Sequence, residues 1–541
     1  MKKGTSSGPT EEDLKPSVKL KSEFNKKAAK PVSAGGLLAP NGRREQLKGK
    51  RYVLTCAQNN TDVNPGFLKA LEAYCKDNDA ELLVSRFTYN KGAFDNKDQT
   101  NGELYYDPKL AKYICDKPVQ IGKDLVFGGE LDISPTTSNP LSGFDNYFQG
   151  KSGVVPNPRV AMKSLPGLGE DSARFLYTTG AVTQRNYIQK KSGQNAEFHH
   201  NYGALLVEVD ESGHSFVRQL AADNDGTFQD LTNKYLPNGK IERNQSIEAI
   251  TLGDIHVEKT DPVQDAVTFG KGGIMETLKP KYSFLQDIMD FTARNHHNMK
   301  DPFFWAEQKQ KGNTVEGGFG TVAAWLKRHE KEGRKDIIVE SNHDEAFDRW
   351  LKEQDARFDP DNARFWHEAS AERYKEIESG NPDANIFEWA VRRAADLPNA
   401  VFLRENDSFI IGKNAEDGQG IECALHGHSG PNGARGSPKG FTQLATKANT
   451  GHTHTAGIID GVYTAGVSGK LDMEYNKGPS SWSHSHVITY PNGKRAIITV
   501  KNGKWHADDK THKAEAPLVP LIPKVEPMKL PKPAPKLTVV R

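Results

Sequence analysis

Five short motifs in the second half of the chain carry side chains that bind divalent cations. They are GDIH (253–256), DIMD (287–290), SNHD (341–344), ALHGH (424–428) and GHTH (451–454). Carboxylate, carboxamide and imidazole ligands without a thiolate favour Mn, Fe or Zn over Ca or Mg alone. One Asp-x-His pair arises easily by chance, whereas five such motifs in one chain predict a metal centre.

The first and last motifs have the spacing that a site for two cations needs. Asp254 and His256 lie two residues apart, so at the end of a strand both side chains project to the same side. In the last motif Gly451 lets the backbone turn sharply, so that His452 and His454 can reach two cations from one loop.

The two middle motifs offer a bridging carboxylate and a histidine that need not bind metal. Asp287 is the first carboxylate after its predicted strand, and we expect it to bridge two cations. Asp290 could bridge instead, although capping a helix or holding a loop is the role that we favour for it. Asn342 supplies a neutral oxygen ligand, and the adjacent His343 can face the same pocket without ligating.

Apolar, strand-like segments precede the motifs and explain how distant residues could meet. Examples are SIEAITLG before the first motif, DIIVE before the third and GIECAL before the fourth. In a layered α/β sheet the carboxyl ends of the strands converge on one edge, where ligand sites are built. We therefore expect the five motifs to form a single dinuclear site.

Other polar residues near the motifs are less informative. Arg435, in the glycine-rich stretch after the fourth motif, could hold a phosphate by bidentate contacts, and an equally weighted alternative is a solvated loop arginine. We expect His428, His484 and His486 to be structural, because seven other residues already complete a two-cation site.

The chain is long enough for more than one hydrophobic core, and strand and helix signals alternate along it. The segment 51–87 predicts a βαβ unit, and 202–221 predicts a hairpin. The fold class expected is α/β, with a separate α/β domain before the metal-binding domain. The expected divisions are a flexible basic arm (1–50), an N-terminal α/β domain (51–240), a metal-binding domain (246–510) with helical insertions (298–333 and 345–400), and a tail rich in Pro and Lys (511–541).

Composition indicates the cellular compartment of the protein more than its function. The net charge is only +2, and the four cysteines are widely spaced, so neither a disulfide framework nor a cysteine zinc site is predicted. We find no secretory signal and no apolar run of the roughly 18 residues that a membrane span needs. These features favour a reducing cytoplasm.

As an ordered set, the motifs resemble those of the calcineurin-like metallophosphoesterase superfamily from residue 254 to residue 454. Two positions depart from the family pattern, because Gln286 and Ser341 stand where the family usually has glycine. Neither departure removes a ligand. The resemblance implies the metallophosphoesterase fold, a β-sandwich flanked by helices.

The resemblance also implies roles for individual residues. Asp287 would bridge two cations, with Mn most favoured and Fe, Zn or Mg as alternatives, and His343 would act on the substrate without ligating. The residues holding one cation would be Asp254, His256 and His454, and those holding the other would be Asn342, His426 and His452.

Within that superfamily, the chain resembles the host-DNA-degrading pre-early nucleases of T-odd-type tailed bacteriophages. This implies a metal-dependent DNase in the cytoplasm of the infected bacterium, with DNA as partner, a homo-oligomer as an option and no membrane association. A phosphomonoesterase or nucleotide phosphodiesterase is the alternative enzyme. A scaffold for nucleic acid or protein that has lost catalysis is the alternative from another class.

Overall fold

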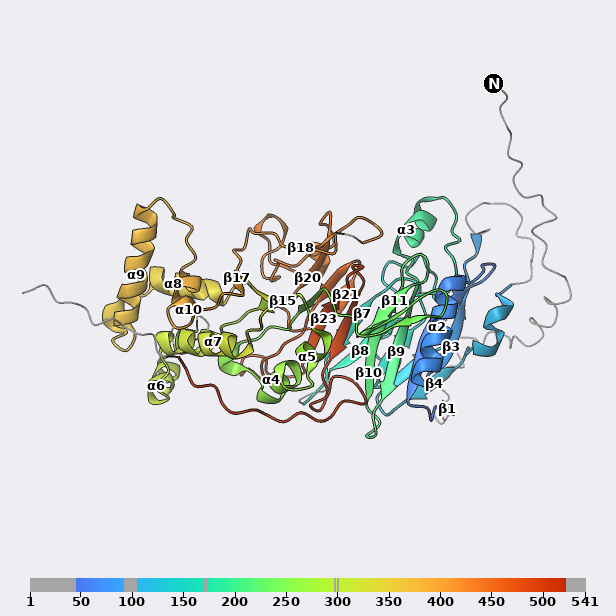
Figure 1. The fold of residues 1–541 in the computed structure, drawn as a ribbon, viewed down its shortest axis with the longest axis horizontal. Coiled ribbons are helices and arrows are strands. Elements are labelled where there is room, and N and C mark those ends of the chain that lie inside the picture. The colour runs from blue at the N-terminus through green and yellow to red at the C-terminus, as the bar shows by residue number, and fades with distance from the viewer. Residues whose placement is uncertain are drawn as a thin grey trace, which may run out of the picture. The chain divides into compact units, whose positions relative to one another are not determined.

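The computed structural model describes residues 45–91, 105–169, 173–295, 298, 301–413 and 415–521. Nearly all of the expected basic arm and residues 522–541 of the expected tail lie outside this part of the chain. Two compact units are present. Unit 1 comprises Met1–Ile288, Lys331–Asn342 and Asn399–Ala516, and unit 2 comprises Met289–Glu330, His343–Pro398 and Pro517–Arg541. The α/β class is confirmed, because unit 1 contains mixed sheets with helices (Figure 1).

The predicted βαβ unit and hairpin are both confirmed in a four-stranded sheet of unit 1. Its order is β10 (Ser215–Ala221), β9 (Gly203–Val209), β2 (Arg51–Gln58) and β3 (Glu81–Phe87). Helix α2 (Pro65–Asn78) joins the parallel strands β2 and β3. The Asn64 side chain caps this helix by accepting a hydrogen bond from the Phe67 amide, and Pro65 occupies the first turn, where its missing N–H costs nothing.

An eleven-stranded sheet runs through both halves of the described sequence. Its order is β1 (Glu45–Gln46), β4 (Pro118–Ile121), β5 (Leu125–Gly128), β6 (Ser152–Val155), β8 (Arg174–Thr178), β7 (Met162–Leu165), β21 (Gly457–Ile459), β22 (Val462–Thr464), β20 (Lys447–Thr450), β19 (Ile421–Glu422) and β18 (Ile410–Ile411). The join is the antiparallel pairing of β7 with β21, in which Met162 lies opposite Ile458.

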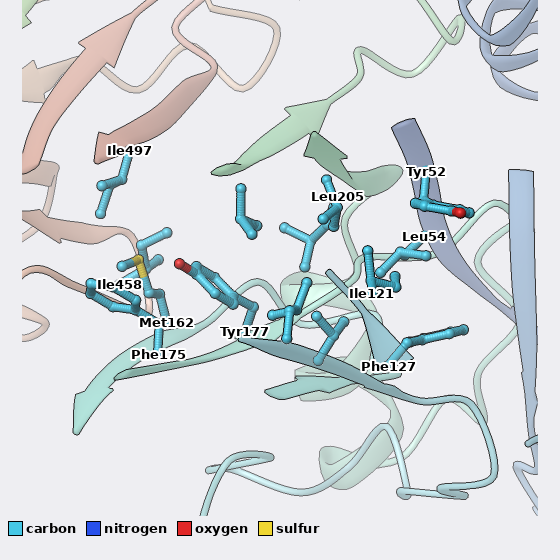
Figure 2. Packing of buried hydrophobic residues seen from close by; sticks show 14 of the residues in the cluster. Tyr52, Leu54, Ile121, Phe127, Met162, Phe175, Tyr177, Leu205, Ile458 and Ile497 are labelled. Carbon is cyan, nitrogen blue, oxygen red and sulfur yellow. The ribbon is translucent and has the colours of Figure 1, made fainter. Parts of the chain in front are cut away.

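This join differs from the expected separate N-terminal domain. Strands from 51–240 and from 246–510 belong to one sheet and to one compact unit. They also share a core, in which Ile458 and Ile497 from the C-terminal part pack with Met162, Phe175 and Leu205 (Figure 2). The sequence did not reveal this shared sheet, because strands about 300 residues apart can pair without leaving a local pattern in the sequence.

A six-stranded sheet carries the first three motifs. Its order is β17 (Ala400–Phe402), β16 (Lys335–Val339), β15 (Tyr282–Gln286), β14 (Ala249–Thr251), β23 (Ser485–Thr489) and β24 (Arg495–Thr499). Strands β14 to β17 are parallel. One core cluster joins this sheet to β18 and β19 of the eleven-stranded sheet, with Phe284 and Ile337 packed against the same group as Ile411 and Ile421.

Smaller elements complete unit 1. They are a three-stranded sheet of β11 (Phe228–Asp230), β12 (Asn233–Tyr235) and β13 (Ile241–Glu242), and the helices α3 (Lys191–His199), α4 (Pro262–Phe269), α5 (Ile274–Leu278) and α11 (Pro438–Phe441).

Unit 2 is helical where the structure describes it. Its helices are α6 (Pro302–Gln310), α7 (Val315–His329), α8 (Asp344–Glu353), α9 (Ala363–Glu378) and α10 (Ile386–Arg392). Phe319 of α7 packs against rings from three other helices, Phe347, Phe365 and Phe387. Four of these helices lie within the stretches 298–333 and 345–400, and α8 begins one residue before the second stretch.

None of the helices in the described residues combines the length and apolar character that crossing a membrane requires.

Candidate metal centre

All five motifs follow the carboxyl end of a strand in unit 1. Asp254 follows β14, Asp287 follows β15 and Asn342 follows β16, three adjacent parallel strands of the six-stranded sheet. His426 follows β19, and His452 follows β20, two parallel neighbours in the eleven-stranded sheet. Each short motif therefore begins within two residues of the end of its strand, and both sheets, which share a core cluster, deliver ligands.

Four of the predicted ligands form one buried group. Ligand atoms of Asp254, His256, Asp287 and His454 all lie within 4.8 Å of one another. His454 Nε2 is 3.1 Å from Asp254 Oδ2, and it is also 3.1 Å from His256 Nε2. His256 Nε2 is 3.3 Å from Asp287 Oδ2. Two imidazole nitrogens that face each other between two carboxylates have the donor types and spacing of a site for a divalent cation.

Two of the other predicted ligands, His426 and His452, lie close to Asp287 and to each other. His426 Nε2 is 3.8 Å from Asp287 Oδ2, the same oxygen that faces His256. The His452 ring lies next to the His426 ring, with 5.2 Å between centroids. Asp287 Oδ2 thus faces both His256 and His426, and its role as a bridging carboxylate stays a prediction.

Three atoms of this set are compatible with a bound ion. Asp254 Oδ1, Asn342 Oδ1 and His426 Nε2 are buried and have no hydrogen-bond partner among the residues that the structure describes. Buried polar atoms are normally satisfied, because leaving one unpaired costs about 1–3 kcal/mol. A pair of cations would satisfy all three atoms, so the residues present fit such a pair.

The backbone at the ligands is unusual in a way that agrees with a functional role. His256, Asp287, His452 and His454 have φ values of 45°, 47°, 70° and 53°. This left-handed region costs a residue with a side chain on the order of 1–3 kcal/mol, and such residues concentrate at functional sites. The turn at the end of each strand redirects the side chain that follows.

Glycines beside the first and last motifs provide room for this packing. A Cβ atom on Gly451 would lie 2.2 Å from Asp254 Oδ1, and one on Gly253 would lie 2.6 Å from the backbone nitrogen of Val467. Both distances are too short for any residue other than glycine. The close approach of the last motif to Asp254 therefore depends on Gly451, and that of the first motif to Val467 depends on Gly253.

The two departures from the family pattern have structural roles at the site. Ser341 Oγ donates a hydrogen bond of 2.6 Å to Asp287 Oδ1, and Gln286 Oε1 is 3.0 Å from His426 Nδ1. Because Gln286 Oε1 accepts a hydrogen bond from His426 Nδ1, the other ring nitrogen, Nε2, faces Asp287. Side chains that orient ligands in this way often tune a metal site strongly. From the sequence alone these two residues were only anomalies.

A further residue that the motifs did not indicate is Trp482. Its ring lies edge-on to the His454 imidazole, with centroids 4.1 Å apart. The contact restricts rotation of the histidine ring. The only signal in the sequence was an aromatic residue just before the segment that forms β23.

The pKa values of three ligands, His426, His452 and Asp254, are shifted in the direction that metal binding requires. Burial lowers the pKa of His426 to about 4, and burial also lowers the pKa of His452. For Asp254, burial acts to raise the pKa, but His426 and His454 outweigh it and the pKa is lowered. Neutral imidazoles and ionised carboxylates are the forms that bind cations.

Asp290 and His343 belong to unit 2, where they contact each other. The Asp290 carbonyl accepts a 3.0 Å hydrogen bond from His343 Nδ1, and Asp290 Oδ2 accepts one of 2.8 Å from Thr292 Oγ1. The role of Asp290, whether it holds the loop or bridges cations, stays a prediction. His343 directly precedes α8, is 5% exposed, and its catalytic role stays a prediction.

Of the remaining candidates, two are structural as expected. His486 Nδ1 accepts from the Gly253 amide and its Nε2 lies 2.7 Å from Gln264 Nε2, while His484 Nε2 donates to the Gly469 carbonyl. His428 lies 3.4 Å from Glu405. Arg435 is exposed on its loop, so a contact with phosphate stays a prediction for it.

Comparison with known proteins identifies one relative of nearly equal length. The chain is 42% identical over 505 residues to Protein A1 of Escherichia phage T5, an alignment covering 91% of this chain and 89% of that protein. No protein-family model matches the chain, and no solved structure matches it.

Proposed function

Because the chain belongs to the family of Protein A1 of Escherichia phage T5, we propose that it acts in phage infection, as a metal-dependent DNase. The proposed reaction is hydrolysis of DNA phosphodiester bonds at a dinuclear centre of the metallophosphoesterase type. The observation that supports this function best is the convergence of buried carboxylates and imidazoles from the ends of five strands, with Asp287 Oδ2 facing both His256 and His426.

The ligand groups suggest how two cations would be held. Asp287 would contact both cations, and Asp254 would contact one of them. The remaining ligands would be His256 and His454 on the first cation and Asn342, His426 and His452 on the second. Bound there, two divalent cations supply polarisation of a phosphoryl oxygen and acidification of water, which hydrolysis of a phosphodiester needs at neutral pH. Mn fits the mixed oxygen and nitrogen ligands, and Fe, Zn and Mg are alternatives.

The protein contributes orientation and proton transfer. Ser341 and Gln286 fix the carboxylate of Asp287 and the ring of His426, so the reacting groups need little rearrangement. His343 donates from Nδ1 to a carbonyl, so Nε2 is the nitrogen that would protonate the departing alkoxide or stabilise the developing negative charge.

DNA is proposed as the substrate from the resemblance to phage nucleases, and the setting is the cytoplasm of the infected bacterium early in infection. The competing enzyme is a phosphomonoesterase or a nucleotide phosphodiesterase, which needs the same ligands. A scaffold without catalysis would need neither the positive φ angles at the ligands nor the buried ligand atoms that have no hydrogen-bond partner among the described residues.

The decisive experiment compares substrates with a matched inactive variant. Supercoiled plasmid, single-stranded DNA and p-nitrophenyl phosphate are each incubated with the full chain and Mn²⁺, with and without EDTA, beside Asp254→Asn as control. We expect cleavage of DNA that EDTA and the substitution abolish. Intact DNA with turnover of p-nitrophenyl phosphate would favour the monoesterase. DNA binding without hydrolysis and without bound metal would favour the scaffold.

A further inference from the structure

A second polar cavity lies in unit 1, and none of the seven predicted metal ligands lines it. Its volume is about 630 Å³. The end of α3, the start of β20 and the turn before β24 contribute to its walls. Strand β20 begins at this cavity with Lys447 and ends at the loop of His452, so the cavity lies at the opposite end of that strand from the metal centre.

One wall contains an arginine with unused hydrogen-bond donors. Arg159 is only 4% exposed, and its Nη1 donates a 2.6 Å hydrogen bond to Asp460. Its Nε and Nη2 atoms are buried and have no hydrogen-bond partner among the described residues. A guanidinium can bind an anion in bidentate fashion through adjacent N–H groups, so two unpaired donors in a cavity wall indicate a missing acceptor.

A second buried arginine adds positive charge, and no carboxylate forms a salt bridge with it among the described residues. Arg495 is 5% exposed and donates to the Ala448 and Gly461 carbonyls and to Asn449 Oδ1. Asp417, which also lines the cavity, acts on its charge without a direct contact. Burial lowers the pKa of this guanidinium. Buried charges are normally paired, because desolvation is costly.

The lining as a whole carries more positive than negative side chains. With Arg159 and Arg495 included, five Lys and Arg residues line the cavity against three Asp and Glu residues. His199, which also lines it, has its pKa lowered by burial and by the nearby Arg159, so it is neutral at pH 7 and adds no charge. The cavity therefore favours an anionic ligand.

The rim carries a surface that suits a flat ring. Phe198 lines the cavity and is 75% exposed, which is unusual for a large apolar side chain. An exposed aromatic ring is a sequence-tolerant stacking partner for a nucleobase. Asn201 and Asn224 also line the cavity and offer carboxamides to the edges of a base or sugar.

We propose that this cavity binds a nucleotide, with its phosphate against Arg159 and its base against Phe198. The volume lies within the range of ordinary small-molecule sites. Such a site is distinct from the metal centre and does not depend on the reaction proposed there.

Calorimetric titration of the full chain tests this. Deoxyadenosine monophosphate, deoxyadenosine and inorganic phosphate are each titrated with EDTA present, so that binding at the metal centre does not contribute. We expect one monophosphate per chain, bound more tightly than either fragment. Absence of monophosphate binding at millimolar concentration would overturn the proposal, as would equal affinity for deoxyadenosine.

Variants then locate the site. Arg159→Gln should weaken monophosphate binding about tenfold or more, the usual effect of losing a hydrogen bond between charged groups. Phe198→Ala should reduce the affinity toward that of inorganic phosphate. If Arg159→Gln unfolds, Lys494→Gln serves in its place: it removes a positive charge from a partly exposed residue of the cavity lining and should also weaken monophosphate binding. Arg174→Gln, outside the cavity, is the matched control, and affinity unchanged in both cavity charge variants would refute the assignment.

Discussion

Replacing Gly451 by alanine should damage the metal centre without removing a ligand. The new Cβ atom would lie 2.2 Å from Asp254 Oδ1 and 3.2 Å from the side chain of Gln286. Real contacts of a Cβ atom are essentially never below 3.0 Å, so either the loop or Asp254 has to move by about 1 Å. Movement of the loop is restricted, because the Gly451 amide donates to the His426 carbonyl at 2.7 Å.

The size of the effect follows from that displacement. A misplacement of about 1 Å at a catalytic group can cost on the order of 100-fold in rate, and loss of a residue that supports metal ligands typically costs about 10–100-fold in metal affinity. Overpacking a buried site also destabilises the fold by about 1–3 kcal/mol. For Gly451→Ala we therefore expect at least a tenfold weaker affinity for Mn²⁺ in a chain that still folds.

The measurement is a calorimetric titration with Mn²⁺, with thermal unfolding as the check on folding. Gly457→Ala is the matched control, because its Cβ would meet its nearest neighbour, the Met162 carbonyl oxygen, at an ordinary 3.4 Å. The control should bind Mn²⁺ like the unmodified chain. If Gly451→Ala also bound Mn²⁺ with unchanged affinity, the packing of the last motif against Asp254 would not hold the site together.

Three further predictions concern other residues. His343→Ala should keep the metal content measured by mass spectrometry yet lose about 100-fold or more of the DNA cleavage rate, and full activity would refute its proposed proton transfer. Ser341→Ala, which removes the hydrogen bond to Asp287, should weaken Mn²⁺ binding about tenfold, whereas an unchanged titration would mean that this bond does not orient the carboxylate. Burial lowers the pKa of His200 to about 3, so the unfolded chain, with an ordinary value near 6.5, binds the extra proton and stability falls as the pH drops below about 6.5. Between pH 7 and 5 the unmodified chain should therefore lose about 2 kcal/mol more than His200→Gln in urea unfolding, and equal losses would contradict a buried neutral histidine.

Features of the fold and of the candidate site could be predicted from the sequence where the interacting residues are close together along the chain. The βαβ unit and the hairpin were predicted because their patterns are local, with a cap at Asn64 and alternating apolar residues on either side of the turn before Ser215. The candidate ligands were found for a related reason. Each motif begins within a few residues of a strand end, and the ends of parallel strands converge.

The arrangement of the sheets could not be predicted in the same way. The pairing of Met162 with Ile458 joins segments that neither composition nor periodicity relates. We therefore expected a separate domain where the structure has a shared sheet. Packing side chains such as Trp482 were missed for the same reason, because contact with His454 requires the fold to be known.

The positions of Gln286 and Ser341 show how a departure from a family pattern can be explained physically. Glycine at these positions would supply no side chain to Asp287 or His426. Here Ser341 and Gln286 supply one hydrogen bond to each. These contacts provide a reason for the substitutions that the spacing of the motifs does not reveal.

The charge balance at Asp254 gives the strongest physical reason to expect a cation. This carboxylate is fully buried, and its pKa is lowered, so it is ionised at neutral pH. Its partners are the His452 amide and the His454 ring, and no Lys or Arg pairs with it among the described residues. His426, whose charge would otherwise compensate, has a pKa of about 4 and is neutral. A buried negative charge without a Lys or Arg partner is costly, and a divalent cation among these ligands removes that cost.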